Sequence, residues 1–139
     1  MRIEDMMTKE VTIGGMDDTL GDLQKIFESK HLHHLPIVHA GRLVGIVSDR
    51  DVLRFVSPYV NTMGEDNRAL NTLKKKAHQI MTRDVVTVRA HDTVAAAASM
   101  MLENCCSCLP VLSDAGAIVG IVTKTNILEC FAREGMALS

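Results

Sequence analysis

The strongest constraint on the fold of this 139-residue chain is an internal repeat. Short motifs recur in the same order at a spacing of 74 residues: Met7-Thr8 with Met81-Thr82, Asp18-Thr19 with Asp92-Thr93, and Leu35-Pro36 with Leu109-Pro110. Gly45 recurs as Gly120 at a spacing of 75, because the turn before it gains one residue. Several matches at a nearly constant spacing indicate two copies of one structural unit.

Each copy predicts the element order β-α-β-β-α. An extended segment is followed by a threonine that can cap a helix, and then by apolar residues at helical spacing. A strand with a proline near its start, a glycine turn and a second strand follow, which is typical of a β-hairpin. The extended segments are Val11 to Ile13 and Val85 to Val88, the helix faces begin at Leu20 and Val94, and the hairpins join Leu35 to Val38 with Leu43 to Val47 and Leu109 to Leu112 with Ile118 to Val122.

The two copies predict the domain organisation. Residues 1–60 form the first repeat, residues 61–79 a linker that contains a helix, and residues 80–139 the second repeat. Ala69 to Met81 shows helical spacing, with Lys74-Lys75-Lys76 as its solvated face. A repeat of about sixty residues has a small core for an independent domain. We therefore expect an α+β fold in which the sheets of the two repeats share one common core.

Composition argues against several classes of protein. The formal net charge is −2, whereas a nucleic-acid-binding protein should carry a basic face. The longest near-continuous apolar stretch, Val94 to Leu102, is too short to span a bilayer, and the acidic start of the chain does not resemble a signal peptide. The four cysteines do not form a disulfide framework. We therefore expect a cytoplasmic protein with neither a nucleic acid nor a membrane as partner.

The end of each hairpin is the candidate functional position. Ser48 and Thr123 stand where a strand is expected to end and a helix to begin, and the free backbone N–H groups of a helix start can bind an anion. Ser48-x-x-Asp51 is equally the pattern of a helix cap that needs no ligand. Arg50 could reach further phosphates or lie in solvent.

With both copies laid out, the chain resembles the CBS-domain family, specifically a stand-alone tandem pair (a Bateman module). It is similar in layout to the bacterial CBS pairs of the acetoin-utilisation type. The motifs that carry the resemblance are Met7-Thr8, Asp18-Thr19-Leu20, Leu35-Pro36-Ile37-Val38 and Gly45-Ile46-Val47-Ser48-Asp49-Arg50-Asp51, with Met81-Thr82, Asp92-Thr93, Leu109-Pro110-Val111 and Gly120-Ile121-Val122-Thr123 in the second copy.

The resemblance implies two repeats related by a pseudo-two-fold axis, with two clefts between them for adenosine-containing ligands, and a homodimer formed through helices. In the family, the hydroxyl of the Ser/Thr-x-x-Asp motif lies near phosphate and the aspartate binds the ribose hydroxyls. The first cleft would then comprise Ile46, Ser48, Arg50 and Asp51 with Thr82, Val86, Cys106 and Ser107. The second would comprise Ile121, Thr123 and Asn126 with Thr8, Val11, Leu32 and His33.

The second cleft departs from the family pattern at Asn126. An amide has one acceptor oxygen and no charge, whereas a carboxylate has two acceptor oxygens and a negative charge. We therefore expect the cleft at Asn126 to be the weaker one.

The function expected from these residues is regulation rather than catalysis, because no nucleophile–base pair with an orienting acid is present. The ligand would be AMP, ADP, ATP, NAD or S-adenosylmethionine, as in energy sensing, and no cofactor would be required. Binding would shift the conformation of the dimer, which a protein partner would detect. The alternatives are a ligand-free dimerisation scaffold and a thiol or metal sensor formed by Cys105, Cys106 and Cys108. His31, His33, His34 and His39 lack the spacing of a metal site, so none is expected there.

Overall fold

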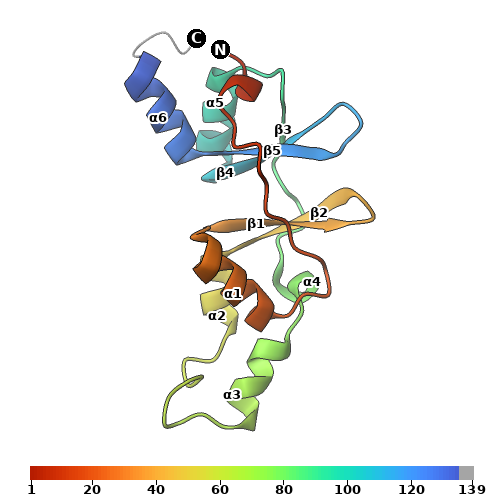
Figure 1. Ribbon diagram of the computed structural model, residues 1–139, viewed down its shortest axis with the longest axis vertical. Coiled ribbons are helices and arrows are strands. Elements are labelled where there is room, and N and C mark those ends of the chain that lie inside the picture. The colour runs from red at the N-terminus through yellow and green to blue at the C-terminus, as the bar shows by residue number, and fades with distance from the viewer. Residues whose placement is uncertain (135–139) are drawn as a thin grey trace. The chain divides into compact units, whose positions relative to one another are not determined.

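Each copy folds into a hairpin and two helices, but its first segment belongs to the unit that the other copy builds. In the computed structural model, which describes residues 1–134, one compact unit comprises residues 12–84 and the other comprises residues 1–11 with the chain from Val85 onward. We call them the first-copy unit and the second-copy unit (Figure 1). These units are defined by packing and divide the chain after residues 11 and 84. They do not test the repeat boundaries at residues 60 and 80, which stay a prediction.

The first-copy unit is built on an antiparallel hairpin. Strand β1 (His34–His39) pairs with β2 (Arg42–Ser48). The turn between them passes through Ala40 and Gly41, whose φ angles are 51° and 77°. Helices α1 (Leu20–Lys30) and α2 (Asp49–Phe55) flank the hairpin in sequence. The predicted hairpin and both helices are confirmed.

The core of the first-copy unit follows the apolar periodicity of α1. Leu20 and Leu23 are fully buried and Phe27 is nearly so, because these positions fall on one face of the helix. They pack with apolar residues of both strands and of α2: Leu35, Ile37, Val47 and Val52. Thr19 caps α1 by accepting a hydrogen bond from the Asp22 amide.

One sequence prediction in this unit is wrong. The expected helix from Ala69 to Met81 is three short pieces: α3 (Asn67–Asn71), the 3-10 helix η2 (Thr72–Lys74) and α4 (Ala77–Ile80). Lys75 is extended, with ψ of 145°, and its carbonyl accepts a hydrogen bond from the Leu20 amide, so the start of α1 interrupts the helix. The segment expected to be extended, Val11 to Ile13, makes no regular strand pairing, and next to it Gly14 forms an isolated parallel bridge with Ile37.

The second-copy unit contains a three-stranded sheet. Strand β4 (Cys108–Leu112) pairs antiparallel with β5 (Ile118–Thr123) and parallel with the short β3 (Val88–Arg89). Helices α5 (Val94–Asn104) and α6 (Lys124–Glu134) complete this unit, with the 3-10 helix η1 (Ile3–Asp5) near its start. The expected extended segment from Val85 to Val88 is a strand only from Val88.

The first residues of the chain belong to the second-copy unit because they contribute to its core. Ile3 is fully buried with residues of the sheet and of α5, and its amide donates a hydrogen bond to the Asp92 carbonyl. Each unit therefore has a buried cluster of its own, and the core shared by both sheets stays a prediction. Within residues 1–134, no helix is long and apolar enough to cross a membrane.

Candidate functional site

The first-copy junction lies where β2 ends at Ser48 and α2 begins at Asp49. The Asp51 amide donates to Ser48 Oγ at 3.1 Å, and the Ser48 amide donates to Asp51 Oδ2 at 2.9 Å. These two bonds form a capping box, which satisfies N–H groups that the first turn of a helix leaves without intrahelical partners. Both side chains are half-buried. Ser48 and Asp51 thus hold a hydroxyl and a carboxylate together within the first turn of α2.

A residue from far along the chain completes this junction. The Ile46 amide donates to the Thr82 carbonyl at 3.0 Å, and the Thr82 amide donates to the Ile46 carbonyl at 2.9 Å. Thr82 itself is exposed, whereas its neighbour Met81 is buried against Gly45. The structure therefore brings Thr82 to the strand that carries Ile46 and Ser48, within one unit.

The second-copy junction repeats this arrangement. The Asn126 amide donates to Thr123 Oγ1 at 3.2 Å, and the Thr123 amide donates to Asn126 Oδ1 at 2.9 Å. Thr8 and Ile121 exchange the same pair of backbone bonds, each at 2.9 Å. The difference is that Asn126 Oδ1 also accepts a bond from the Thr123 hydroxyl at 3.0 Å. The single acceptor oxygen of Asn126 is therefore used twice within its own cap.

The predicted site residues divide between the two units. Those in the first-copy unit are Leu32, His33, Ile46, Ser48, Arg50, Asp51 and Thr82, and those in the second-copy unit are Thr8, Val11, Val86, Cys106, Ser107, Ile121, Thr123 and Asn126. The structure brings together the junction residues of each unit with their bridging threonine. The grouping of Val86, Cys106 and Ser107 with Asp51, and of Leu32 and His33 with Asn126, stays a prediction.

An ion pair at the first-copy junction was not predicted from the sequence. His33 Nδ1 lies 2.9 Å from Asp49 Oδ2, and the Asp49 amide donates to the His33 carbonyl at 3.0 Å. Burial raises the pKa of the Asp49 carboxyl, but the hydrogen bond from His33 and the nearby imidazoles outweigh this, so its pKa lies below the ordinary value. The second-copy unit repeats only the backbone bond, from the Lys124 amide to the Ser107 carbonyl, so the repeat held no signal for the side-chain pair.

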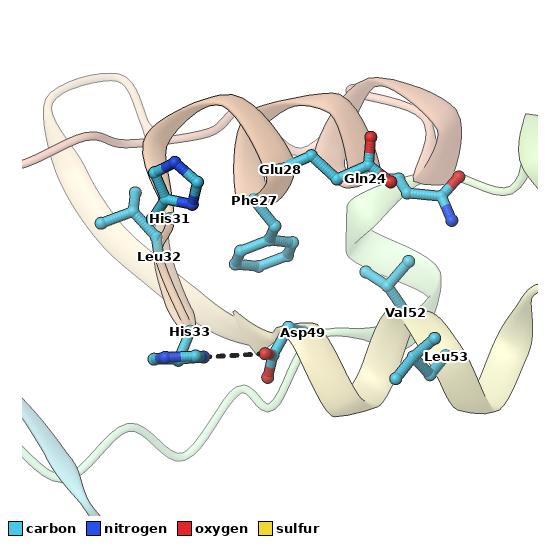
Figure 2. A pocket seen from close by; sticks show the side chains of 9 residues that line it. All are labelled: Gln24, Phe27, Glu28, His31, Leu32, His33, Asp49, Val52 and Leu53. Atoms are coloured by element: carbon cyan, nitrogen blue, oxygen red, sulfur yellow. Dashed lines mark hydrogen bonds and ion pairs between the residues drawn. The ribbon is translucent and has the colours of Figure 1, made fainter.

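A pocket of about 420 Å³ lies between α1 and α2 in the same unit (Figure 2). Phe27 points from α1 into this space and Val52 lies on α2 across from it. The His33–Asp49 pair borders the pocket at the start of α2. Pockets of this volume with an apolar floor and a few polar groups are typical binding positions.

The cysteines differ in exposure. Cys105 is exposed, Cys106 is half-buried, and Cys108 and Cys130 are buried. Burial raises the pKa of the Cys108 thiol to about 12, so this side chain is an unreactive thiol at neutral pH. Among the residues that the structure describes, no group of three or more His, Cys, Asp or Glu side chains is placed to hold a metal ion.

The sequence of this chain is similar to those of known proteins. The profile of the CBS domain family matches residues 3–58 and 77–133. A CBS domain-containing protein of Dictyostelium discoideum is 32% identical over 130 residues, which cover 91% of this chain and 88% of that protein. Protein MJ1225 of Methanocaldococcus jannaschii is 28% identical over 94% of this chain, which spans 47% of that relative and thus about half its length.

Solved structures are similar to this chain over most of its length. The Vibrio cholerae protein AcuB is 27% identical, with a TM-score of 0.80 over 96% of this chain and 92% of its own. The CBS domain pair of protein MJ0100, solved with 5′-methylthioadenosine and S-adenosyl-L-methionine, is 29% identical, with a TM-score of 0.79. That match covers 96% of this chain and 98% of the other.

Proposed function

The chain belongs to the CBS domain family, and from that premise we propose that it is a regulatory module that binds an adenosine-containing ligand. The observation that carries the proposal is the Ser48–Asp51 junction, which holds a hydroxyl, a carboxylate and a helix start together on the edge of one strand. Thr82 extends the same strand edge. We propose that the side of the site that contacts the adenine base is completed by Val86, Cys106 and Ser107.

The geometry of the cap is compatible with ribose binding. Asp51 accepts the capping bond through Oδ2, and a carboxylate offers about four lone-pair positions on its two oxygens. Acceptor capacity therefore remains for a vicinal diol. At the second junction, Asn126 Oδ1 already accepts two bonds within the cap. This supports the proposal that the Asn126 site, with Thr8, Val11, Leu32, His33 and Ile121, is the weaker of the two.

The proposed ligands are AMP, ADP, ATP, NAD and S-adenosylmethionine, which share the adenosine that the junction would recognise. The MJ0100 pair supports this class, since its structure contains two adenosine derivatives. The 27% identity with AcuB supports the finer proposal that the chain is of the acetoin-utilisation type. The proposal gives the module no catalytic step and no required cofactor.

The proposed mechanism is a population shift in a cytoplasmic homodimer. A ligand that binds one arrangement of the two units more tightly moves the equilibrium toward it by the difference in binding free energy. A protein partner that contacts only one arrangement would then detect the ligand.

A thermal-shift panel of the five ligands, with 5′-methylthioadenosine added, tests the proposal. At about a hundredfold excess over Kd, one site adds roughly 2.7 kcal/mol to the stability. Asp51→Asn is the decisive variant, because an amide at this position can still cap the helix, as Asn126 does, but loses the second acceptor oxygen. We expect a ligand-induced shift in wild type that Asp51→Asn abolishes and Asn126→Ala retains. Flat curves for all six ligands in wild type would contradict the proposal.

A ligand-free dimerisation scaffold is the second candidate function. It is favoured by the capping boxes, which give Ser48 and Asp51 a structural role that needs no ligand. In that case the melting temperatures of wild type and Asp51→Asn respond equally to every ligand, and the function of the protein rests on dimerisation alone.

A further inference from the structure

A histidine that is not among the predicted site residues lies beside the first-copy junction. In the antiparallel hairpin, His34 of β1 is the register partner of Ser48, the last residue of β2. Side chains of directly opposed residues lie on the same face of an antiparallel pair, with their Cβ atoms about 4.5–5.5 Å apart. Both residues are half-buried. The His34 imidazole is therefore a neighbour of the Ser48 hydroxyl within one unit.

Charged groups of two neighbouring segments act on this imidazole. From α2, Asp49 and Asp51 favour its protonated form and Arg50 opposes it. His33, on the segment before β1, opposes the protonated form as well. Burial has the largest effect and lowers the pKa of His34 below its ordinary 6.5. His34 is thus neutral at neutral pH and gains a positive charge when the pH becomes acidic.

The second-copy junction has a different residue at this position. Cys108 of β4 is the register partner of Thr123. It is buried, and its thiol has a pKa of about 12, so it stays uncharged over the physiological pH range. The two copies therefore place a titratable side chain beside one junction and an uncharged side chain beside the other.

We infer that His34 makes the choice among adenosine-containing ligands at the first-copy junction depend on pH. This inference rests on the proposed function, in which Asp51 binds the ribose and the Ser48 hydroxyl lies near the phosphate. A protonated His34 beside Ser48 adds a positive charge that attracts a phosphate and can donate a hydrogen bond to it. Acidification therefore shifts the preference toward ligands with phosphate, such as NAD, over ligands without it, such as 5′-methylthioadenosine.

The effect is reciprocal, because the binding of a proton and the binding of a ligand at neighbouring positions are linked. If protonation of His34 raises the affinity for NAD, bound NAD raises the proton affinity of His34 by the same factor. An opposite charge close to a titratable group favours its charged form, so bound NAD is expected to raise the pKa of His34. A ligand without phosphate leaves this pKa unchanged.

Isothermal titration calorimetry of the full chain at pH 7.5, 6.5 and 5.5 tests the inference with two probes. NAD carries a pyrophosphate whose charge is constant over this range, whereas a terminal phosphate gains a proton at about pH 6. The first-copy site is identified as the one that Asp51→Asn abolishes. From pH 7.5 to 5.5 we expect the Kd of wild type for NAD to fall about tenfold, and the Kd for 5′-methylthioadenosine to change by less than about twofold.

A substitution with a matched control assigns the effect to His34. His34→Gln keeps a polar side chain that does not titrate, and is expected to reduce the change in the Kd for NAD to less than about twofold. His39→Gln is the control, because His39 is exposed and pairs with Arg42 at the far end of the same strand. This variant is expected to retain the full change. Circular dichroism at each pH confirms that both variants are folded.

The pKa of His34 gives a second readout, which a purely structural role of the side chain would not move. It is measured from the NMR signal of the imidazole Cε1–H group, which is assigned by its absence in His34→Gln. We expect saturating NAD to raise this pKa and saturating 5′-methylthioadenosine to leave it unchanged.

The outcomes separate this inference from the proposed function. If neither probe binds at any pH, both are overturned. If the probes bind but the Kd for NAD depends on pH equally in wild type and His34→Gln, this inference alone is overturned. A pKa of His34 that stays the same with bound NAD, or binding of 5′-methylthioadenosine alone at every pH, would also overturn this inference and leave the adenosine site in place.

Discussion

The contact between Gly45 and Met81 supports the first-copy junction and predicts that Gly45→Ala is destabilising. Gly45 is buried in β2, opposite Ile37 of β1. A Cβ built on Gly45 would lie 2.8 Å from Met81 Cγ and 3.1 Å from Met81 Cβ. The Met81 side chain can rotate away in part, but its backbone is held by a 2.9 Å hydrogen bond to the Ala77 carbonyl. The added methyl group therefore forces the two segments apart.

Overpacking of this kind costs about 1–3 kcal/mol of folding free energy. For a chain of this size, a loss of 2 kcal/mol lowers the melting temperature by roughly 6–8 °C. Urea unfolding followed by circular dichroism measures the free energy, and differential scanning calorimetry measures the melting temperature. Gly21→Ala is the matched control, because its nearest contact would be the Leu73 carbonyl oxygen at 3.6 Å and it lies in α1. An alanine there is expected to stabilise the protein by roughly 0.5–1 kcal/mol.

A double-mutant cycle locates the cause of the loss. If Met81 is the obstacle, Gly45→Ala should cost much less when Met81→Ala is already present, since the new methyl group then enters vacated space. An unchanged cost in the Met81→Ala background, or a Gly45→Ala variant as stable as wild type, would refute the reasoning. Gly120 and Met7 form the matching contact in the second-copy unit and should behave in the same way.

Two further predictions concern titration and thiol chemistry. Burial lowers the pKa of His34 below its ordinary 6.5, so the folded state binds fewer protons than the unfolded state in the window between the two values. The stabilisation by neutral His34 should therefore be fully present above about pH 6.5 and should be lost as the pH drops through that window. Urea unfolding at pH 7.5, 6.0 and 5.0 measures the free energy of unfolding, and its dependence on pH should be smaller in His34→Gln than in wild type. An equal pH dependence in both proteins would contradict the prediction. A thiol-specific reagent at pH 8, with the labelled residues identified by mass spectrometry, should label Cys105 quickly in the native protein, because Cys105 is exposed. Cys108 should be labelled only after unfolding, because it is buried and its thiol has a pKa of about 12. Rapid native labelling of Cys108 would show that its burial is transient.

The element order could be predicted from the sequence because it depends on local patterns that the repeat shows twice. Proline, glycine and β-branched residues at fixed spacing specify each hairpin, and the 3.6-residue periodicity of Leu20, Leu23 and Phe27 specifies the buried face of α1. The Ser48–Asp51 cap could be predicted in the same way, because its two residues are three positions apart. These features involve neighbours along the chain.

The prediction that was wrong involves a segment whose conformation depends on a distant partner. Ala69 to Met81 has the spacing of one helix, yet the bond from Leu20 to Lys75 interrupts it. The place at which the extended first segment bridges the sheet, Gly14, likewise depends on its distant partner Ile37. Local propensity is a weak preference, and tertiary hydrogen bonds override it.

By itself, the sequence determined that this protein has two copies of one β-α-β-β-α unit, with a capped junction at the end of each hairpin. The resemblance to the family grouped Thr82 with Ile46 and Thr8 with Ile121, but only the tertiary structure showed the backbone bonds that join them and the unit in which each pair lies. Those backbone pairs join residues tens of positions apart, and beside them Met81 packs closely on Gly45 and Met7 on Gly120. The repeat in the sequence specifies which helices and strands each copy forms. The packing of side chains from distant segments decides in which unit the first segment of each copy lies.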